Sequence, residues 1–263
     1  MNLIFSVIAY GKLGAKELGY GSDLDLVFLY DDTELGHQTF YQKLAQQLIK
    51  WLSLETPTGK IAELDTRLRP DGALLVTSLN RFTEYQHHKA HLWEHQALSR
   101  ARAIAGNEGL KSVFENLRHL ILLKKRDAQE VKQEIVTMRE KMKEHHHKKY
   151  RILSTSFDLK YSKGGMIDIE FMVQYVVLVH SHDYPQLIAN TGTVHLLKLA
   201  AQLGLLPAGL ALNSSGVYAQ LRLLQHHRRL NHAEFISLTN DELALIQNAN
   251  SSQKLWEVLF EGV

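Results

Sequence analysis

Two kinds of hydrophobic periodicity divide the chain. In the first hundred residues, apolar runs typical of strands cover 3–10, 24–30, 60–68 and 73–77. Between the second and third runs, an amphipathic stretch from about His37 to Leu54 predicts a helix, and its apolar stripe consists of Phe40, Leu44, Leu48 and Trp51. Further helices are expected after Thr77-Ser78, whose side chains suit an N-terminal cap, and through 92–98. This part therefore has α+β character.

From about residue 107 onward the strand signals nearly vanish. Apolar residues recur at spacings of four, three and four on a charged background, which predicts a helix of many turns; they are Val131, Ile135, Met138 and Met142. Further helical patterns cover 166–181, 191–204, 208–232 and 240–260, with breaks expected at Pro185, Gly204–Pro207 and Asn213–Gly216. We expect a mixed-sheet domain over 1–106 and an all-α helical bundle over 107–263.

Composition limits the functional classes. The chain has 263 residues, 45% of them hydrophobic and 22% charged, which is ordinary for a folded globular protein. The 30 basic and 28 acidic residues give a formal charge of +2 and no global case for nucleic-acid binding. No cysteine is present, which excludes thiolate chemistry and leaves the cytoplasm as the default location. No apolar run is long enough for a membrane span, and a start almost inside a strand suggests a domain of a larger protein.

Two aspartates stand at the head of the second apolar run. In Ser22-Asp23-Leu24-Asp25-Leu26, the carboxylates are two residues apart, and side chains at that spacing share one face of a strand. Two close carboxylates repel unless a cation or a proton relieves them, and Mg²⁺ takes oxygen ligands of this kind. Asp23 and Asp25 are therefore candidate metal ligands. On the motif alone, a turn cap or a solvated loop end stays open as the alternative.

A glycine turn precedes the pair. Gly11-Lys12-Leu13-Gly14 follows the first apolar run, and glycine permits a tight turn whose backbone N–H groups can approach phosphate oxygens. Gly11, Lys12 and Ser22 are thus candidate phosphate contacts through N–H groups, a cation and a hydroxyl. Lys12 as a solvated turn lysine is the open alternative.

A third carboxylate follows downstream. The segment 61–70 alternates, which puts Asp65 and Arg67 on one face of a half-buried strand. If this strand lies beside the first, Asp65 can complete a site for two metals about 3.5–4 Å apart. Arg67 and Arg69 would then neutralise phosphate charge. The alternative for Asp65 and Arg67 is a surface ion pair on an edge strand.

Other polar groups carry weaker signals. Asp168 and Glu170 stand two apart at a predicted helix start, where they would diverge by about 200° and where acidic residues favour the helix dipole. The histidine runs 87–88, 145–147 and 226–227 are adjacent residues that point about 100° apart on a helix, so we expect structural or surface roles and not zinc binding.

Taken together, the motifs resemble glutamine synthetase adenylyltransferase, a member of the nucleotidyltransferase β-polymerase-like superfamily. The resemblance rests on Gly11-Lys12-Leu13-Gly14, Glu17-Leu18, Ser22-Asp23-Leu24-Asp25-Leu26 and Asp65-x-Arg67-Leu68-Arg69-Pro70. It continues in order through 75–78, 93–102, 138–142 and 164–171, and so spans nearly the whole chain. Two departures are Ala15, where the family usually has a second glycine, and a loop at 71–74 about two residues shorter than usual.

The resemblance implies a specific activity. The family's full-length enzyme has two similar halves, one adding AMP to a glutamine synthetase tyrosine and one removing it by phosphorolysis, and this chain is closer to the C-terminal, adenylylating half. ATP would be a substrate, with two Mg²⁺ ions (Mn²⁺ as a substitute) on Asp23, Asp25 and Asp65. Glutamine synthetase would be the protein substrate, and a PII signalling protein and glutamine the regulators. Asp168 and Glu170 would face the catalytic cleft.

Three other functions stay open. They are the adenylyl-removing half, a regulatory or binding module without turnover, and a small-molecule nucleotidyltransferase, against which the helical-domain blocks argue.

Overall fold

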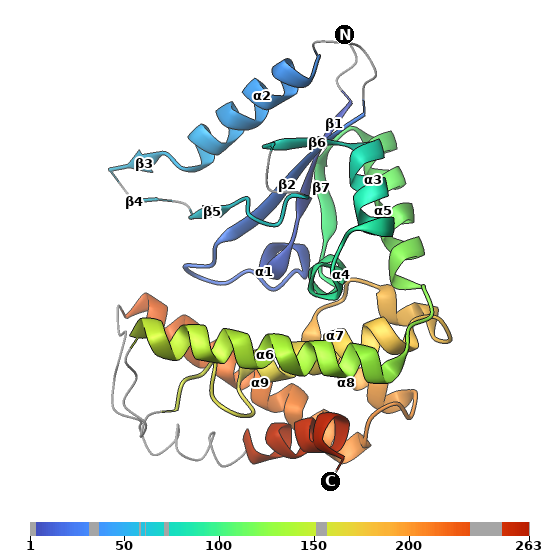
Figure 1. Ribbon diagram of the computed structural model, residues 1–263. Coiled ribbons are helices and arrows are strands. Elements are labelled where there is room, and N and C mark those ends of the chain that lie inside the picture. The colour runs from blue at the N-terminus through green and yellow to red at the C-terminus, as the bar shows by residue number, and fades with distance from the viewer. Residues whose placement is uncertain are drawn as a thin grey trace. The chain divides into compact units, whose positions relative to one another are not determined.

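A computed structural model describes residues 4–31, 37–57, 59–60, 62–70, 74–150, 157–231 and 249–262 (Figure 1). The chain divides into two compact units, residues 1–124 and 125–263. Unit 1 contains a five-stranded mixed sheet with helices, and the described part of unit 2 contains helices but no strand. The expected fold class is confirmed. No helix in the described ranges has both the length and the apolarity that a membrane crossing requires.

The sheet of unit 1 is built around β2, Leu24–Tyr30. On one side β2 pairs antiparallel with β1, Phe5–Ala9, which in turn pairs antiparallel with β7, Arg102–Gly106. On its other side β2 pairs in parallel first with β5, Leu64–Asp65, and further along with β6, Val76–Ser78. A separate hairpin joins β3, Glu55–Thr56, to β4, Gly59–Lys60.

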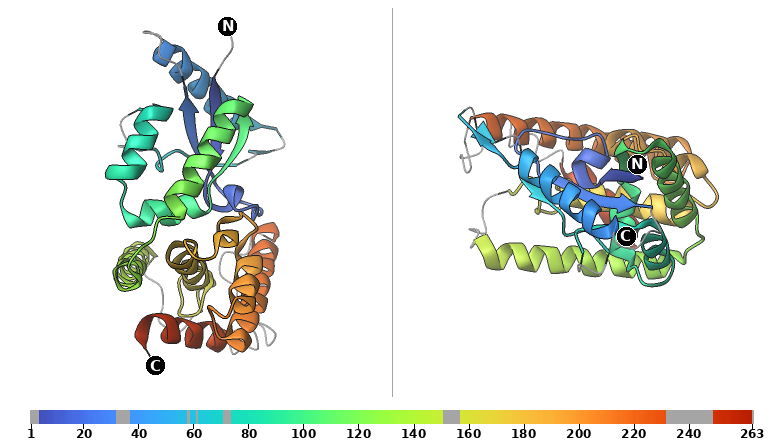
Figure 2. Two further views of the ribbon diagram at one scale, coloured as in Figure 1. Left: turned by 90° about the vertical axis from the view of Figure 1, so that its right-hand side faces the viewer. Right: turned by 90° about the horizontal axis from the view of Figure 1, so that it is seen from above.

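Alternating side chains of β2 bury both faces of this sheet. Leu26, Phe28 and Tyr30 pack with α2 on one face, whereas Val27 and Leu29 pack with α3, α4 and α5 on the other. Figure 2 shows these helices beside the sheet. These helices are α2 (His37–Leu52), α3 (Leu79–His88), α4 (Leu92–Ser99) and α5 (Glu108–Leu122). A sheet covered on both faces leaves its edges and the ends of its strands as the places for functional side chains.

Three features of unit 1 differ from the sequence expectations. The strand expected over 60–68 shrinks to Leu64–Asp65 because the Asp65 carboxylate accepts the Arg67 N–H and turns the chain. Strand β7 was not predicted, since its short mixed sequence lacks a clear alternation. The expected boundary at 106/107 falls before α5, yet unit 1 extends to Lys124 because Leu110 and Phe114 of α5 lie in the core of the sheet.

The helix predicted after Ser78 and the helices predicted in unit 2 largely match those of the structure. Ser78 caps α3, its hydroxyl accepting the Arg81 N–H at 3.4 Å, as predicted. In unit 2 the main helices are α6 (Ala128–Tyr150), α7 (Met166–His180), α8 (Thr193–Gln202) and α9 (Ala208–Leu230). A 3-10 helix occupies Pro185–Ile188, and the helical residues 249–256 lead into a π-helical turn, Glu257–Glu261. Part of the pattern expected over 240–260 lies outside the described residues.

The break expected at Asn213–Gly216 is wrong. Helix α9 runs through it without interruption because it packs along α8 and buries Ser214 and Ser215. The Ser215 hydroxyl donates to the Leu212 carbonyl at 2.7 Å, so this buried hydroxyl is satisfied within the helix. Tertiary packing thus overrides the weak helix propensity of the segment.

Candidate functional site

The register of β2 and β5 brings two of the predicted carboxylates together. Asp25 pairs with Asp65 across the parallel strands, and the Leu24 N–H donates to the Glu63 carbonyl at 2.8 Å to tie the strands at this level. Paired residues on neighbouring strands point to the same face, and Asp23 precedes Asp25 by two residues. Asp23 is exposed, whereas Asp25 and Asp65 are half-buried. The structure therefore gathers these aspartates at one end of the sheet.

The pKa of Asp25 reflects burial and the nearby carboxylates. Burial, and then the negative charges of Asp65 and Asp23, raise the pKa of Asp25 to about 6. Arg67 and Arg100 oppose this shift. An acid whose ionised form is disfavoured by neighbouring carboxylates is stabilised when a cation binds among them. Desolvation and like charge together mark this end of the sheet as a candidate functional site.

Arg67 folds back onto Asp65. Its Nε donates to Asp65 Oδ2 at 2.8 Å and to Oδ1 at 3.0 Å, its backbone N–H donates to Oδ1 at 2.8 Å, and its terminal nitrogen also contacts Oδ2. The Arg67 hydrogen bond is the main reason that the pKa of Asp65 is lowered. The edge-strand ion pair is thus present, and it coexists with the approach of Asp65 to Asp25. Arg67 is 88% exposed, so its guanidinium remains accessible to a phosphate.

Arg69 belongs to the same turn after β5. Its guanidinium donates to the Thr66 carbonyl and to the Thr66 hydroxyl, each at 3.0 Å. Arg69 therefore closes the turn that carries Arg67, and its role as a phosphate contact stays a prediction.

The predicted glycine turn lies directly against Asp25. Gly11 begins α1, Gly11–Gly14, with a φ of +52°, and a Cβ at this position would lie 2.2 Å from Asp25 Oδ2. The Tyr10 N–H donates to the Asp25 carbonyl at 2.9 Å, which fixes the turn to β2. Glycine is required here both by the backbone conformation and by the close carboxylate. Lys12 lies in the same turn and is half-buried.

Ser22 lies in the turn immediately before Asp23. Its hydroxyl accepts the Gly19 N–H at 3.2 Å, and its own N–H donates to the Gly19 carbonyl at 3.0 Å. The structure therefore brings Gly11 into contact with Asp25 and gives Ser22 a role in shaping the loop that leads to Asp23.

Sequence reasoning missed two arginines at this site. Arg102 donates from Nε to the Gly14 carbonyl and from a terminal nitrogen to the Leu13 carbonyl, both at 3.2 Å. Arg100 forms an ion pair with Glu17 at 2.7 Å, in which both side chains are nearly buried. The available signal was the pair of arginines flanking Ala101, which is fully buried. Ala15 itself has a φ of −72°, so the glycine that the family usually has there is not required by the backbone.

The donor chemistry fits a divalent cation with an open coordination shell. Within the described ranges, no group of three or more His, Cys, Asp or Glu side chains forms a ready metal cluster, and Asp65 shares its oxygens with Arg67. Mg²⁺ is usually bound by one or two carboxylates together with waters and substrate phosphates, and not by a closed protein cage. Exposed Asp23 and half-buried Asp25 offer such a partial set of ligands, with Asp65 adjacent.

Asp168 and Glu170 serve packing inside unit 2. Asp168 is 3% exposed, accepts Arg139 Nε at 2.8 Å, and accepts the Gly164 N–H at 2.9 Å. Glu170 points elsewhere and accepts the Tyr218 hydroxyl at 2.8 Å, as the expected divergence on a helix requires. Both carboxylates therefore bind other residues of unit 2. The buried ion pair of Asp168 with Arg139 was not predicted.

Of the histidine runs, His146 has a clear structural setting. Its Nε2 lies 3.2 Å from an Asp158 carboxylate oxygen, and its ring packs edge-on against Tyr161 with centroids 3.7 Å apart. These contacts join α6 to the segment before α7.

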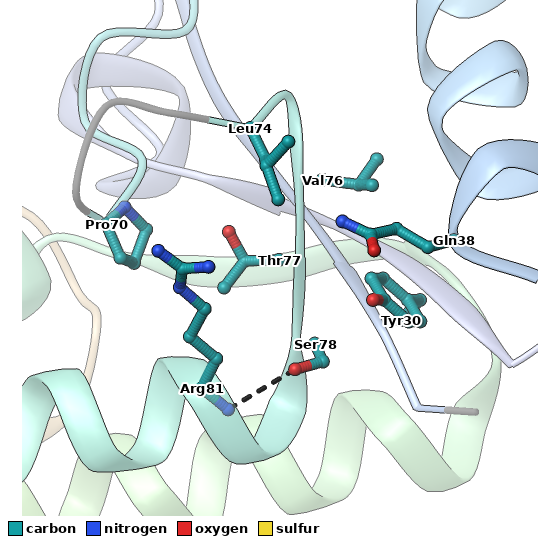
Figure 3. A pocket seen from close by; sticks show the side chains of 8 residues that line it. All are labelled: Tyr30, Gln38, Pro70, Leu74, Val76, Thr77, Ser78 and Arg81. Carbon is teal, nitrogen blue, oxygen red and sulfur yellow. Dashed lines mark hydrogen bonds between the residues drawn. The ribbon is translucent and has the colours of Figure 1, made fainter. Parts of the chain in front are cut away.

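A cavity of about 180 Å³ lies at the other end of β2 (Figure 3). It is lined by Tyr30, Gln38, Pro70, Leu74, Val76, Thr77, Ser78 and Arg81. Tyr30 pairs with Ser78 at the end of β2 opposite to Asp25. None of the predicted site residues lines this cavity, so it is separate from the carboxylates.

A family model described as glutamate-ammonia ligase adenylyltransferase matches residues 2–117, the range that holds the glycine turn and all three aspartates. The chain contains a domain of this family. A second model, described as PII-uridylyltransferase, matches residues 134–234, a range that begins within α6 and contains α7, α8 and α9.

Curated relatives match most of this chain. A protein of Aromatoleum aromaticum is 46% identical over 259 residues, which is 97% of this chain and 27% of the relative. One of Nitrosomonas europaea is 48% identical over 228 residues, 86% of this chain and 24% of the relative. Both are named bifunctional glutamine synthetase adenylyltransferase/adenylyl-removing enzyme. The chain spans about a quarter of their length, and their name joins both activities.

Proposed function

We propose that this chain transfers an adenylyl group from ATP to a tyrosine hydroxyl of glutamine synthetase, releasing pyrophosphate and lowering glutamine synthetase activity in nitrogen regulation. The observation that carries the proposal is the in-register pairing of Asp25 with Asp65 on β2 and β5, beside a glycine turn. This arrangement lies inside the range matched by the adenylyltransferase family. The relatives' names supply the acceptor protein, and the chemistry of the carboxylates supplies the reaction class.

Asp23, Asp25 and Asp65 would hold two Mg²⁺ ions. When bound, Mg²⁺ stabilises charge on the transferring phosphate and lowers the pKa of the attacking hydroxyl. Support comes from the raised pKa of Asp25: burial is its main cause, and the negative charges of Asp65 and Asp23 add to it, which is the repulsion that a cation relieves.

The chain's own residues would bind and orient the nucleotide. Gly11 would present backbone N–H groups to the triphosphate, with Lys12 and Ser22 supplying a cation and a hydroxyl. Arg67 and Arg69 would neutralise the charge that develops on the phosphate oxygens. Because the Arg67 side chain is 88% exposed, its guanidinium is accessible to a phosphate from solvent.

Asp65 would accept the proton of the nucleophile. The tyrosine oxygen forms a bond to the α-phosphorus, the bond from that phosphorus to the β-bridging oxygen breaks, and pyrophosphate leaves with the electron pair. The tyrosine proton passes to an Asp65 carboxylate oxygen. A general base must come within hydrogen-bond distance of the proton that it removes. Asp65 lies on β5 at the edge of the sheet, and its side chain is 17% exposed.

A substitution at Asp65 tests this role. Asp65→Asn keeps the shape of the side chain but removes its charge and its basicity, so transfer of AMP should fall by at least about 100-fold while ATP binding changes little. The matched control is Glu63→Gln, which removes the same charge from an exposed side chain two residues earlier on the segment. Turnover retained in Asp65→Asn, or an equal loss in Glu63→Gln, would sink the assignment.

The direction of the reaction needs a separate assay. The chain is incubated with α-labelled ATP, Mg²⁺ and unmodified glutamine synthetase, and in parallel with adenylylated glutamine synthetase and inorganic phosphate. Label on the tyrosine supports the proposal. Release of ADP from the modified protein would support the adenylyl-removing half instead, and ATP–Mg²⁺ binding with neither reaction would support a regulatory module.

Regulation is proposed through a PII signalling protein and glutamine. The match of residues 134–234 to a PII-uridylyltransferase model supports this part, because that family is named for an enzyme that modifies PII. Addition of purified PII protein or of glutamine to the transfer assay tests it by a change in initial rate.

A further inference from the structure

Helix α1 needs an external support. It spans only Gly11–Gly14, and a helix of one turn is unstable by itself because nucleation fixes several residues for few hydrogen bonds. It also carries a glycine at each end, which adds backbone freedom. Its first residue lies directly against Asp25, where a Cβ would come within 2.2 Å of Oδ2. Something outside α1 must therefore set its position.

Arg102 of β7 binds the C-terminal end of this helix. Its guanidinium spans the last two carbonyls of α1, those of Leu13 and Gly14, with both distances at 3.2 Å. Carbonyls at a helix end have no intrahelical partner, and a cation there also interacts favourably with the helix dipole. Two donors in a fixed planar fork determine both position and orientation, which a single-point contact cannot do.

Arg100 adds a second attachment on the adjacent loop. It pairs with Glu17 at 2.7 Å, and the side chains are 12% and 11% exposed, so water competes little for this contact. A Cβ at Gly14 would lie 2.2 Å from the Arg100 carbonyl and 2.5 Å from the Ala9 carbonyl. The segment that leads into β7 is thus closely packed against α1.

From these contacts we propose that Arg102 and Arg100 are positioning residues of the carboxylate site. They fix the C-terminal side of α1, and the same four residues carry that constraint to Gly11, which touches Asp25. Neither arginine needs to touch the nucleotide for this role. The inference rests on the proposed function for its effect on turnover, but not for its effect on the turn itself.

The test compares Arg102→Met with Arg102→Lys in the full chain. Methionine keeps the apolar stem and removes both hydrogen bonds, whereas lysine keeps the charge and one donor at a time. The control is Lys111→Met, which removes a cation paired with Glu108 on the surface of α5. Three quantities are measured in each variant: amide hydrogen exchange at Leu13 to Ala15, the dissociation constant of Mn²⁺–ATP, and kcat of AMP transfer.

In Arg102→Met we expect faster exchange at these amides, at least threefold weaker Mn²⁺–ATP binding, and a fall in kcat of roughly 10- to 100-fold, as small misplacements of reacting groups produce. Arg102→Lys should recover part of each loss, and Lys111→Met should match the wild type. If Arg102→Lys folds poorly, Arg100→Met is the second variant, and it should show the same three changes as Arg102→Met.

Two results would overturn the inference. Exchange unchanged in Arg102→Met would show that the arginine does not hold the turn. Faster exchange with unchanged Mn²⁺–ATP binding would show a structural role without effect on the site. If the wild type transfers no AMP, the proposed function fails, while exchange and Mn²⁺–ATP binding still decide the positioning role.

Discussion

Replacing Asp25 with asparagine should stabilise the chain in the absence of divalent cations, even though it removes a proposed metal ligand. The pKa of Asp25 is raised to about 6 from an ordinary value of 3.8, so its ionised form is disfavoured by roughly 2 pKa units in the folded state. At about 1.36 kcal/mol per unit this is ~3 kcal/mol. Because Asp25 is only half-buried, solvent screening reduces the usable part to ~1–2 kcal/mol.

The pH dependence gives this prediction its signature. A carboxyl whose folded pKa exceeds its unfolded pKa holds more protons in the folded state between the two values, so stability falls as pH rises from about 4 to about 6. The gain from Asp25→Asn should therefore be complete above pH 6 and should fade as the pH is lowered toward 4.

Thermal unfolding in EDTA at pH 4.5, 6 and 7.5 measures this gain, with a shift of roughly 2–4 °C per kcal/mol expected for a chain of this size. Glu84→Gln, an exposed carboxylate of α3, serves as the control and should change stability by less than about 0.5 kcal/mol. Adding Mg²⁺ and ATP should shrink the advantage of Asp25→Asn, since ligand binding stabilises only the wild type. An Asp25→Asn variant that is less stable than the wild type at pH 7.5, or whose gain does not vary with pH, would refute the reasoning.

Three further substitutions probe the backbone and the helical unit. Gly11→Ala should lose about 1–3 kcal/mol and weaken Mn²⁺–ATP binding, because its φ is +52° and its Cβ would collide with Asp25; Gly216→Ala, in an open position within α9, should gain up to about 1 kcal/mol in the same urea titration. Asp168→Asn should destabilise unit 2 by about 3–5 kcal/mol because Arg139 is left buried without its counter-charge; a loss below 1 kcal/mol by circular dichroism would show that this ion pair is dispensable.

Much of the candidate site was readable from local patterns. Glycine before a charged turn, and aspartates two apart at the head of an apolar run, predict a phosphate and metal site because each rests on a few neighbouring residues. The helical character of the second half was readable for the same reason, since helix periodicity is a local property. The position of the second carboxylate strand was a hypothesis, because pairing between distant segments leaves no local trace.

The tertiary structure decided what lies next to what. Only the parallel register of β2 and β5 places Asp65 beside Asp25. Only the return of the chain along β1 through β7 brings Arg102 to the end of α1, about ninety residues away in sequence. Packing along α8 also keeps α9 unbroken at Asn213–Gly216, where the local sequence favours a turn.

The sequence by itself determined which residues are candidates for the chemistry, because the charge of a carboxylate or an arginine and the backbone freedom of a glycine are properties of the residue type. Their partners were decided by the fold. Asp65 pairs locally with Arg67, and only the register of the two strands brings it beside the like-charged Asp25; Asp168 pairs with Arg139 because helix packing brings them together from distant parts of the chain.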